Sequence, residues 1–152
     1  KDIADFDERP LNRYTSTPDV YRCPSDAGDV LHPEHFPKTN PPAKKTCYNY
    51  YGTSYLVQWN WDGFAVEHVT AAPGQKALTE AALSRAPTTK IIQADWPWHG
   101  NRDPNSRKTQ WHKLGGRGLN TLFGDGHAEI FDFPPDLHNW AGRKPDPANG
   151  FW

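Results

Sequence analysis

The sequence contains no methionine, only two cysteines and no long run of apolar residues. A membrane-spanning helix needs roughly 20 apolar residues, and no segment approaches that length. No signal peptide is visible at Lys1, and we interpret the chain as a mature or truncated product whose targeting segment has been removed. The formal net charge is -1 with lysine and arginine scattered, so no basic stripe can neutralise phosphates and nucleic acid is not expected as a partner.

Sequence motifs of the common hydrolases are also missing. There is no HExxH motif, no GxSxG turn, and no cysteine and histidine pair with a recognisable nucleophile signature. A metal hydrolase, in which a bound ion activates water, is the catalytic alternative. We expect the protein not to be an enzyme.

What the chain does contain is aromatic side chains and backbone breakers. Its 7 Trp, 6 Tyr and 7 Phe can anchor a core that is short of aliphatic residues. Its 15 prolines and 12 glycines disfavour long helices and predict that loops occupy much of the chain. A length of 152 residues fits one domain. We therefore predict a single α+β domain over residues 1–152, with a central antiparallel β-sheet, short helices and long loops.

The two cysteines are Cys23 and Cys47. In a loop-rich chain such a pair suits a disulfide formed in an oxidising compartment, and the alternative is two reduced, buried thiols. Neither cysteine sits in a CxxC or Cys/His spacing, which disfavours zinc binding through this pair.

Local patterns predict the secondary structure in outline. The Tyr- and Trp-rich segment 47–61 predicts a strand, bent at Gly52. Good helix formers over 75–85 predict one or two helical turns, and KIIQA at 90–94 predicts a short strand. Prolines and charges over 27–46 predict a surface loop with a solvated face.

Residues 119–131, LNTLFGDGHAEIF, predict a β-hairpin. Asp125 and Gly126 stand between two apolar runs, and Asp-Gly is a strong signal for a two-residue type I′ turn in which both central residues have positive φ. His127 follows directly, so turn geometry and polar chemistry coincide here.

Carboxylate and imidazole groups in this region predict a divalent cation site. The candidate ligands are Asp95, His112, Asp125 and His127. Such a mixed set suits zinc or another transition metal better than magnesium. Calcium would need further oxygen ligands, such as Asn120 or backbone carbonyls. In the alternative, Asp125 only shapes the turn, His127 begins a strand, and the other two are loop residues.

Several segments match a known family, in order along the chain. They are RPLNRY at 9–14, YRCPSD at 21–26, YNYYGTSY at 48–55, IIQAD at 91–95, and His112 followed by NTLFGDGHAEIF at 120–131. On these segments the chain resembles bacterial type II secretion pseudopilin-like proteins that carry a C-terminal prepilin-processing-associated domain, known for a histidine followed by Asp-Gly. The gap from His112 to Asp125 is longer than the family's usual gap. The family's N-terminal cleavage motif and long hydrophobic helix do not occur in this sequence.

The resemblance implies a pilin-like globular head whose N-terminal spine helix is absent from this chain. It implies a structural subunit of a type II secretion pseudopilus or a related type IV pilin-like filament. Through the missing helix, the subunit would assemble with copies of itself and with other pseudopilins. The implied location is extracytoplasmic, in the periplasm or at the cell surface, with the same helix anchoring the subunit in the inner membrane before assembly.

Five tryptophans support a second hypothesis, a secreted carbohydrate- or surface-binding module with exposed indole rings: Trp59, Trp61, Trp96, Trp98 and Trp111. Trp59 and Trp61, and likewise Trp96 and Trp98, are two residues apart, so on a strand each pair would share one face. The alternative is that these rings fill the core.

The chain ends with the aromatic residues Phe151 and Trp152. Two aromatic side chains at a chain end rarely remain exposed to water. We expect them to pack onto the domain or onto a neighbouring subunit, which makes them candidate subunit contacts.

Overall fold

The computed structural model describes residues 12–30, 46–58, 68–71, 74, 76–100, 102–103, 105–137 and 146–152. Most of the predicted surface loop lies outside these residues, as do Trp59 and Trp61 of the tryptophan hypothesis. None of the helices formed by the described residues combines the length and the apolar character needed to span a membrane.

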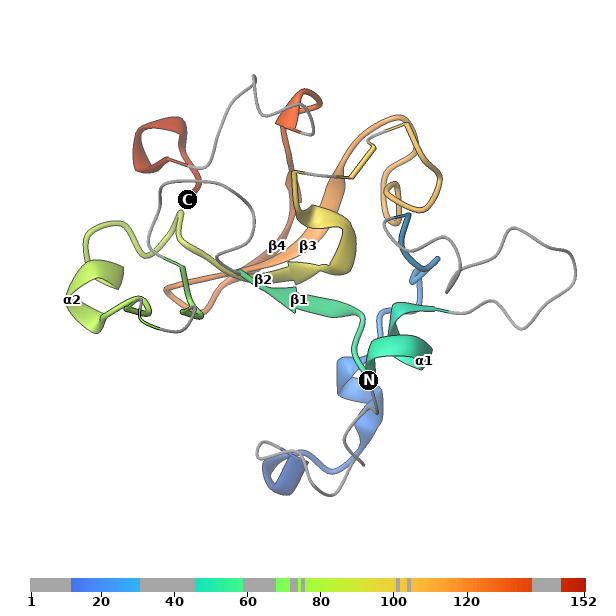
Figure 1. Cartoon of the computed structure of the whole chain (residues 1–152), viewed down its shortest axis with the longest axis horizontal. Helices are drawn as coiled ribbons and strands as arrows, with labels where there is room; N and C mark the ends of the chain where they lie inside the picture. The colour runs from blue at the N-terminus through green and yellow to red at the C-terminus, as the bar shows by residue number, and fades with distance from the viewer. Residues whose placement is uncertain are drawn as a thin grey trace, which may run out of the picture.

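Within the described residues, four antiparallel strands form one sheet in the order β1-β2-β3-β4 (Figure 1). They are β1 Tyr55–Val57, β2 Ile91–Asp95, β3 Gly118–Phe123 and β4 Ala128–Asp132. In their register, Tyr55 pairs with Asp95, Ala94 with Thr121, and Asn120 with Ile130. The predicted α+β class with an antiparallel sheet is thereby confirmed.

The two faces of the sheet differ, because side chains alternate along a strand. On β3, Leu119 and Phe123 belong to the buried core, whereas Leu122 between them is exposed. Ile130 on β4 is exposed as well. Outside the strands the core is mostly aromatic, with Trp98, Trp111, Phe133, Leu137 and Phe151 among its members. A few bulky rings therefore fill the core, as the composition predicts.

The predicted hairpin is present, but its loop is longer than Asp-Gly alone. The loop consists of Gly124, Asp125 and Gly126. The N–H of Phe123 donates to the C=O of His127 at 2.9 Å, and the N–H of Gly126 donates to the C=O of Phe123 at 3.0 Å. Gly126 has a φ of 90°, the left-handed position that follows the turn in a three-residue loop with a bulge. The predicted two-residue type I′ turn is therefore wrong.

Residues Cys47–Tyr51 form helix α1, where the aromatic composition predicts a strand. The carboxylate of Asp26 accepts the backbone N–H groups of Cys47 and Tyr48 at 2.9 and 2.8 Å, which satisfies donors in the first turn of the helix. Gly52, with a φ of 79°, ends the helix. Within the described part of the predicted strand, only β1 is extended, because distant hydrogen-bond partners override the local propensity of the preceding residues.

The helix predicted within 75–85 is a single turn. Helix α2 spans Glu80–Leu83, and the Thr79 hydroxyl caps it by accepting the N–H of Ala82. Helices α1 and α2 lie beyond opposite ends of the sheet (Figure 1). The other helices of the described residues are 3-10 turns: η2 Asn12–Tyr14, η3 Pro18–Tyr21, η5 Trp96–Trp98 and η7 Pro147–Asn149.

The two C-terminal aromatic residues are buried within their own chain, at 1% exposure for Phe151 and 2% for Trp152. The ring of Phe151 packs against that of Phe131, with 5.6 Å between centroids. Trp152 donates its N–H to the C=O of Thr89 at 2.9 Å and accepts the N–H of Ile91 at 2.6 Å. Of the two expected arrangements, packing onto the domain is therefore confirmed for both side chains.

Candidate functional site

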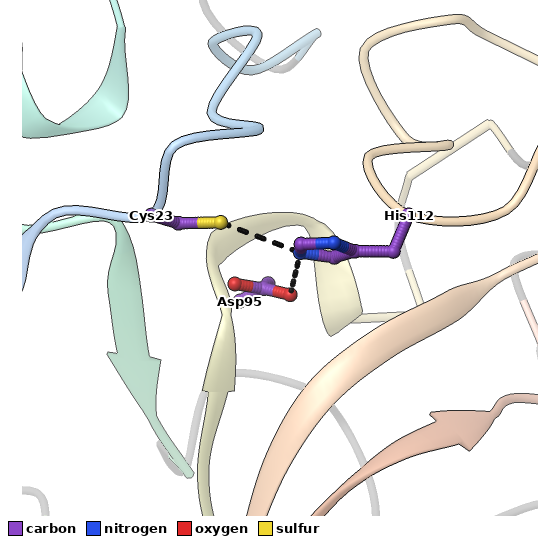
Figure 2. Close-up of side chains that lie close together, drawn as sticks. All are labelled: Cys23, Asp95 and His112. Atoms are coloured by element: carbon purple, nitrogen blue, oxygen red, sulfur yellow. Dashed lines mark hydrogen bonds and ion pairs between the residues drawn. The ribbon is translucent and has the colours of Figure 1, made fainter.

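Three side chains with metal-binding or acid-base chemistry lie together at one end of the sheet (Figure 2). Asp95 is the last residue of β2, and because Ala94 belongs to the core, Asp95 faces the other side of the sheet. Cys23 follows η3, and His112 lies in the loop between η5 and β3. Figure 2 shows Cys23 and His112 reaching toward Asp95 from opposite sides.

The Nε2 atom of His112 is the centre of this cluster. It lies 3.3 Å from Sγ of Cys23, 3.1 Å from Oδ2 of Asp95 and 3.0 Å from Nδ2 of Asn120. The backbone N–H of Asn120 also donates to Oδ2 of Asp95, at 2.7 Å. Asp95 is fully buried, while the side chain of His112 is 16% exposed. The cluster is therefore shielded but borders solvent.

The three neighbours of His112 Nε2 cannot all hydrogen-bond to that atom at the same time. A ring nitrogen either carries one hydrogen or offers one lone pair. With a hydrogen, Nε2 can donate to Asp95 but cannot accept from the Asn120 amide or the Cys23 thiol. With a lone pair, it can accept from only one of its neighbours. In the first case the Cys23 thiol and the Asn120 side chain can donate to the Asp95 carboxylate instead.

Asp95 adds a second unsatisfied group to the cluster. Its Oδ1 atom is buried and has no hydrogen-bond partner within the described part of the chain. Burial raises the pKa of Asp95, against the lowering effect of the Asn120 backbone N–H and of His112. An unpartnered buried carboxylate oxygen is costly, typically about 1–3 kcal/mol, unless another group or an ion binds it.

The cluster does not have the geometry of an activated thiolate. Burial and then the Asp95 carboxylate raise the pKa of the Cys23 thiol to about 12, so the sulfur stays protonated. In a relay of nucleophile, histidine and carboxylate, the histidine uses one ring nitrogen for each partner. Here the thiol and the carboxylate face the same nitrogen. The arrangement is that of ligand atoms converging on one point or of a buried cluster of polar groups.

The predicted disulfide between Cys23 and Cys47 is wrong, because both are buried free thiols. The thiol of Cys23 faces His112. Cys47 begins α1, and burial followed by the charges of Asp26 and Asp29 raises the pKa of its thiol. Each sulfur thus belongs to its own polar environment, which matches the alternative of two reduced, buried cysteines.

The four residues predicted as one cation site form two separate pairs. Asp125 and His127 lie in the hairpin loop, with 2.5 Å between Oδ1 and Nδ1. Donation from the backbone N–H and then the side chain of His127 lowers the pKa of Asp125. That loop adjoins the first residue of β2, whereas Asp95 is the last, a separation of about 13 Å along the strand. Of the four predicted ligands, Asp95 and His112 lie together in the cluster with Cys23.

The described tryptophans do not form an exposed stacking surface. Trp96 and Trp98 lie on η5 and not on a strand, and Trp98 is fully buried. Trp96 is half-buried and stacks on Tyr51, with 3.9 Å between ring centroids. Trp111 and Trp152 are buried. These four rings contribute to packing.

Two members of the cluster were not placed there by sequence reasoning. Cys23 was expected in a disulfide, and Asn120 was considered only as an oxygen ligand for calcium. The signal that could have joined them is the shared resemblance, since YRCPSD, IIQAD, His112 and NTLFGDGHAEIF supply all four residues.

Comparisons with protein-family models, curated proteins and solved structures found no match to this chain.

Proposed function

We propose that this chain is the globular head of a pseudopilin-like filament subunit, with a structural and not a catalytic role. One observation carries the proposal. The segments that carry the resemblance are far apart in sequence, yet they supply Cys23, Asp95, His112 and Asn120 to a single cluster. Segments that share a contact in this way act as one unit in the fold.

A second contact between these segments supports the same role. Asp26 of YRCPSD accepts the hydroxyl of Ser54 in YNYYGTSY at 2.6 Å, beside its bonds to the first turn of α1. Ser54 in turn donates its N–H to the C=O of Tyr21 at 2.8 Å. The paired segments therefore fix the N-terminal part of the domain against the sheet. An active site would instead need an accessible reactive group, whereas the Cys23 thiol is buried and protonated.

In this proposal an N-terminal helix upstream of Lys1 anchors the subunit in the inner membrane and later joins the core of the filament. The domain described above lies outside the cytoplasm, in the periplasm or at the cell surface. Its partners are other copies of the subunit and related pseudopilins.

The sequence of the gene upstream of Lys1 tests the proposal. We expect a prepilin peptidase site followed by about 20 apolar residues, the length that spans a bilayer. A plain secretory signal peptide would overturn the proposal and would favour a secreted binding module that uses Trp59 and Trp61.

Processing and assembly give a second test on the full-length gene product. Co-expression with a prepilin peptidase should shorten the protein by its leader, and the shortened form should appear in sheared filaments. The matched control replaces two apolar residues of the upstream helix with arginine and should lose assembly while the head still folds. Equal recovery of both forms in the filament fraction would contradict the proposed role.

A further inference from the structure

The cluster around His112 holds three kinds of metal-ligating atom. A thiol sulfur, an imidazole nitrogen and a carboxylate oxygen, from Cys23, His112 and Asp95, all lie within 4.8 Å of one another. The three residues come from separate elements and are held in place by the fold. Their convergence does not depend on the proposed filament role.

We infer that Cys23, Asp95 and His112 form a binding site for a soft divalent cation, with zinc as the best match. Zinc bonds of about 2.3 Å to sulfur and about 2.0–2.2 Å to nitrogen and oxygen, meeting near the tetrahedral angle, place ligand atoms roughly 3.3–3.6 Å apart. The observed separations from His112 Nε2 are 3.3 Å to the Cys23 sulfur and 3.1 Å to the Asp95 oxygen. These two separations differ from the expected values by a few tenths of an ångström, and the Cys23 sulfur and the Asp95 oxygen lie within 4.8 Å of each other.

A cation at the point where the three ligand atoms converge would bind all of them at once. It takes the lone pair of His112 Nε2 and lets the Asp95 oxygen and the Cys23 sulfur point at the same centre without a shared hydrogen. On binding, the thiol proton leaves to solvent and the sulfur becomes a thiolate ligand. The unpartnered, fully buried Oδ1 atom of Asp95 gives the carboxylate a second oxygen toward the ion or toward a bound water.

The donor set selects among metals. Magnesium and calcium require mainly oxygen ligands, and this cluster offers one carboxylate. Thiolate with imidazole and carboxylate is a combination that zinc accepts. The fourth position is open to water or to the Asn120 amide, whose oxygen and nitrogen are interchangeable by a flip of the group. The partly exposed edge of His112 gives the ion a route from solvent.

The bound ion would act as a cross-link in place of the expected disulfide. It would join the segment after η3, the end of β2 and the loop before β3 through Cys23, Asp95 and His112. Zinc should therefore raise the melting temperature of the domain. The ligands converge in the folded state and are dispersed in the unfolded chain, so zinc binds the folded state more tightly.

Metal titration of the whole 152-residue chain tests the inference. The protein is stripped with a chelator, then titrated near neutral pH with Zn2+ or with Co2+ as a spectroscopic probe. We expect one equivalent of Co2+ to bind, with the visible bands of a tetrahedral ion and a near-ultraviolet sulfur-to-cobalt charge-transfer band, and Zn2+ to displace it. X-ray absorption of the zinc-loaded protein should show one sulfur among nitrogen and oxygen ligands, and this measurement needs no variant.

Substitutions assign the ligands. Cys23→Ser should remove the charge-transfer band and weaken Zn2+ binding by about tenfold or more. Loss of a residue that only supports a metal ligand already weakens binding by about tenfold, and Cys23 is itself a ligand. Asp95→Asn and His112→Gln should weaken binding while the sulfur band persists. Circular dichroism shows whether each variant is folded.

The matched controls leave the cluster intact. Cys47→Ser removes the other buried free thiol, and Asp125→Asn alters the exposed pair in the hairpin loop. Both should retain one equivalent of Co2+ with an unchanged band. The inference is overturned if the folded wild-type chain takes up no stoichiometric Zn2+ or Co2+, if bound zinc has no sulfur ligand, or if binding follows Asp125 and not Cys23.

Discussion

The carboxylate of Asp29 accepts two hydrogen bonds from the guanidinium of Arg102, at 3.1 Å from Nε and 2.7 Å from Nη2. The two side chains are 0% and 4% exposed. The indole N–H of Trp96 donates to the same carboxylate at 2.9 Å. This ion pair therefore holds the N-terminal segment against the loop that follows η5.

Asp29→Ala should lower the free energy of unfolding by about 3 kcal/mol or more, because it removes the acceptor opposite a buried guanidinium. Urea denaturation of the variant and the wild type measures the loss. Asp132→Ala is the matched control, since Asp132 pairs with Lys113 at 2.6 Å but both side chains are more than half exposed. The control should cost less than about 1 kcal/mol. Similar losses in the two variants would contradict the assigned role of the buried pair.

Asp26→Asn tests the acceptor at the start of α1. Its two carboxylate oxygens accept the N–H groups of Gly28, Cys47 and Tyr48 and the hydroxyl of Ser54. The amide group would turn an N–H toward donors, so we expect a loss of about 2–4 kcal/mol, in the range for hydrogen bonds to a charged group. Thermal or urea unfolding measures the change.

The control for Asp26 lies at the same helix start. Thr46 caps α1 through a single bond, accepting the N–H of Asn49 at 3.0 Å. Thr46→Ala should cost about 1 kcal/mol. If Thr46→Ala lowered the free energy of unfolding more than Asp26→Asn, Asp26 would not be the main hydrogen-bond acceptor that stabilises the start of this helix.

Elements that depend on local signals could be predicted from the sequence. The hairpin around Gly126 and the strand that ends at Asp95 follow from turn residues and short apolar runs within a few positions. Helix α1 could not be predicted in this way. Its stabilising acceptor, Asp26, lies 21 residues before Cys47, and the aromatic residues of the helix favour a strand when read alone.

The candidate site shows the same limit more strongly. Cys23 and His112 are 89 residues apart, so no spacing rule for metal ligands could pair them. Asp125 and His127 were predicted as ligands because they stand near each other and near a histidine in sequence. The register of the sheet places their loop at the opposite end of β2 from Asp95. Ligand sets that depend on tertiary contacts can be identified only when the fold is known.

Gly126→Ala tests the left-handed position in the hairpin loop. At a φ of 90° an added Cβ meets no atom within 4 Å, so any cost comes from the backbone conformation alone. We expect a loss of about 1–2 kcal/mol. Gly126→Asn should lose less, since asparagine tolerates this conformation better. Equal stability of Gly126→Ala and the wild type would show that the loop adopts another turn in solution.

Buried His99 should make the stability of the domain fall in mild acid. Burial lowers the pKa of His99 from 6.5 to about 3, and Arg102, His68 and Arg117 lower it while Asp29 opposes them. The folded state therefore holds a neutral imidazole in a pH range where the unfolded chain binds a proton. Stability is fully present above pH 6.5 and declines as the pH falls toward about 3, at up to about 1.4 kcal/mol per pH unit.

The variant His99→Gln isolates this contribution, because glutamine has no proton to gain. Unfolding free energies of both proteins, measured by urea denaturation at several pH values below 6.5, should diverge in slope. The wild type should lose stability more steeply, whatever the difference between the two proteins at neutral pH. Carboxylates common to both proteins contribute equally and cancel in the comparison. Parallel slopes would mean that His99 gains its proton in the folded state as readily as in the unfolded chain.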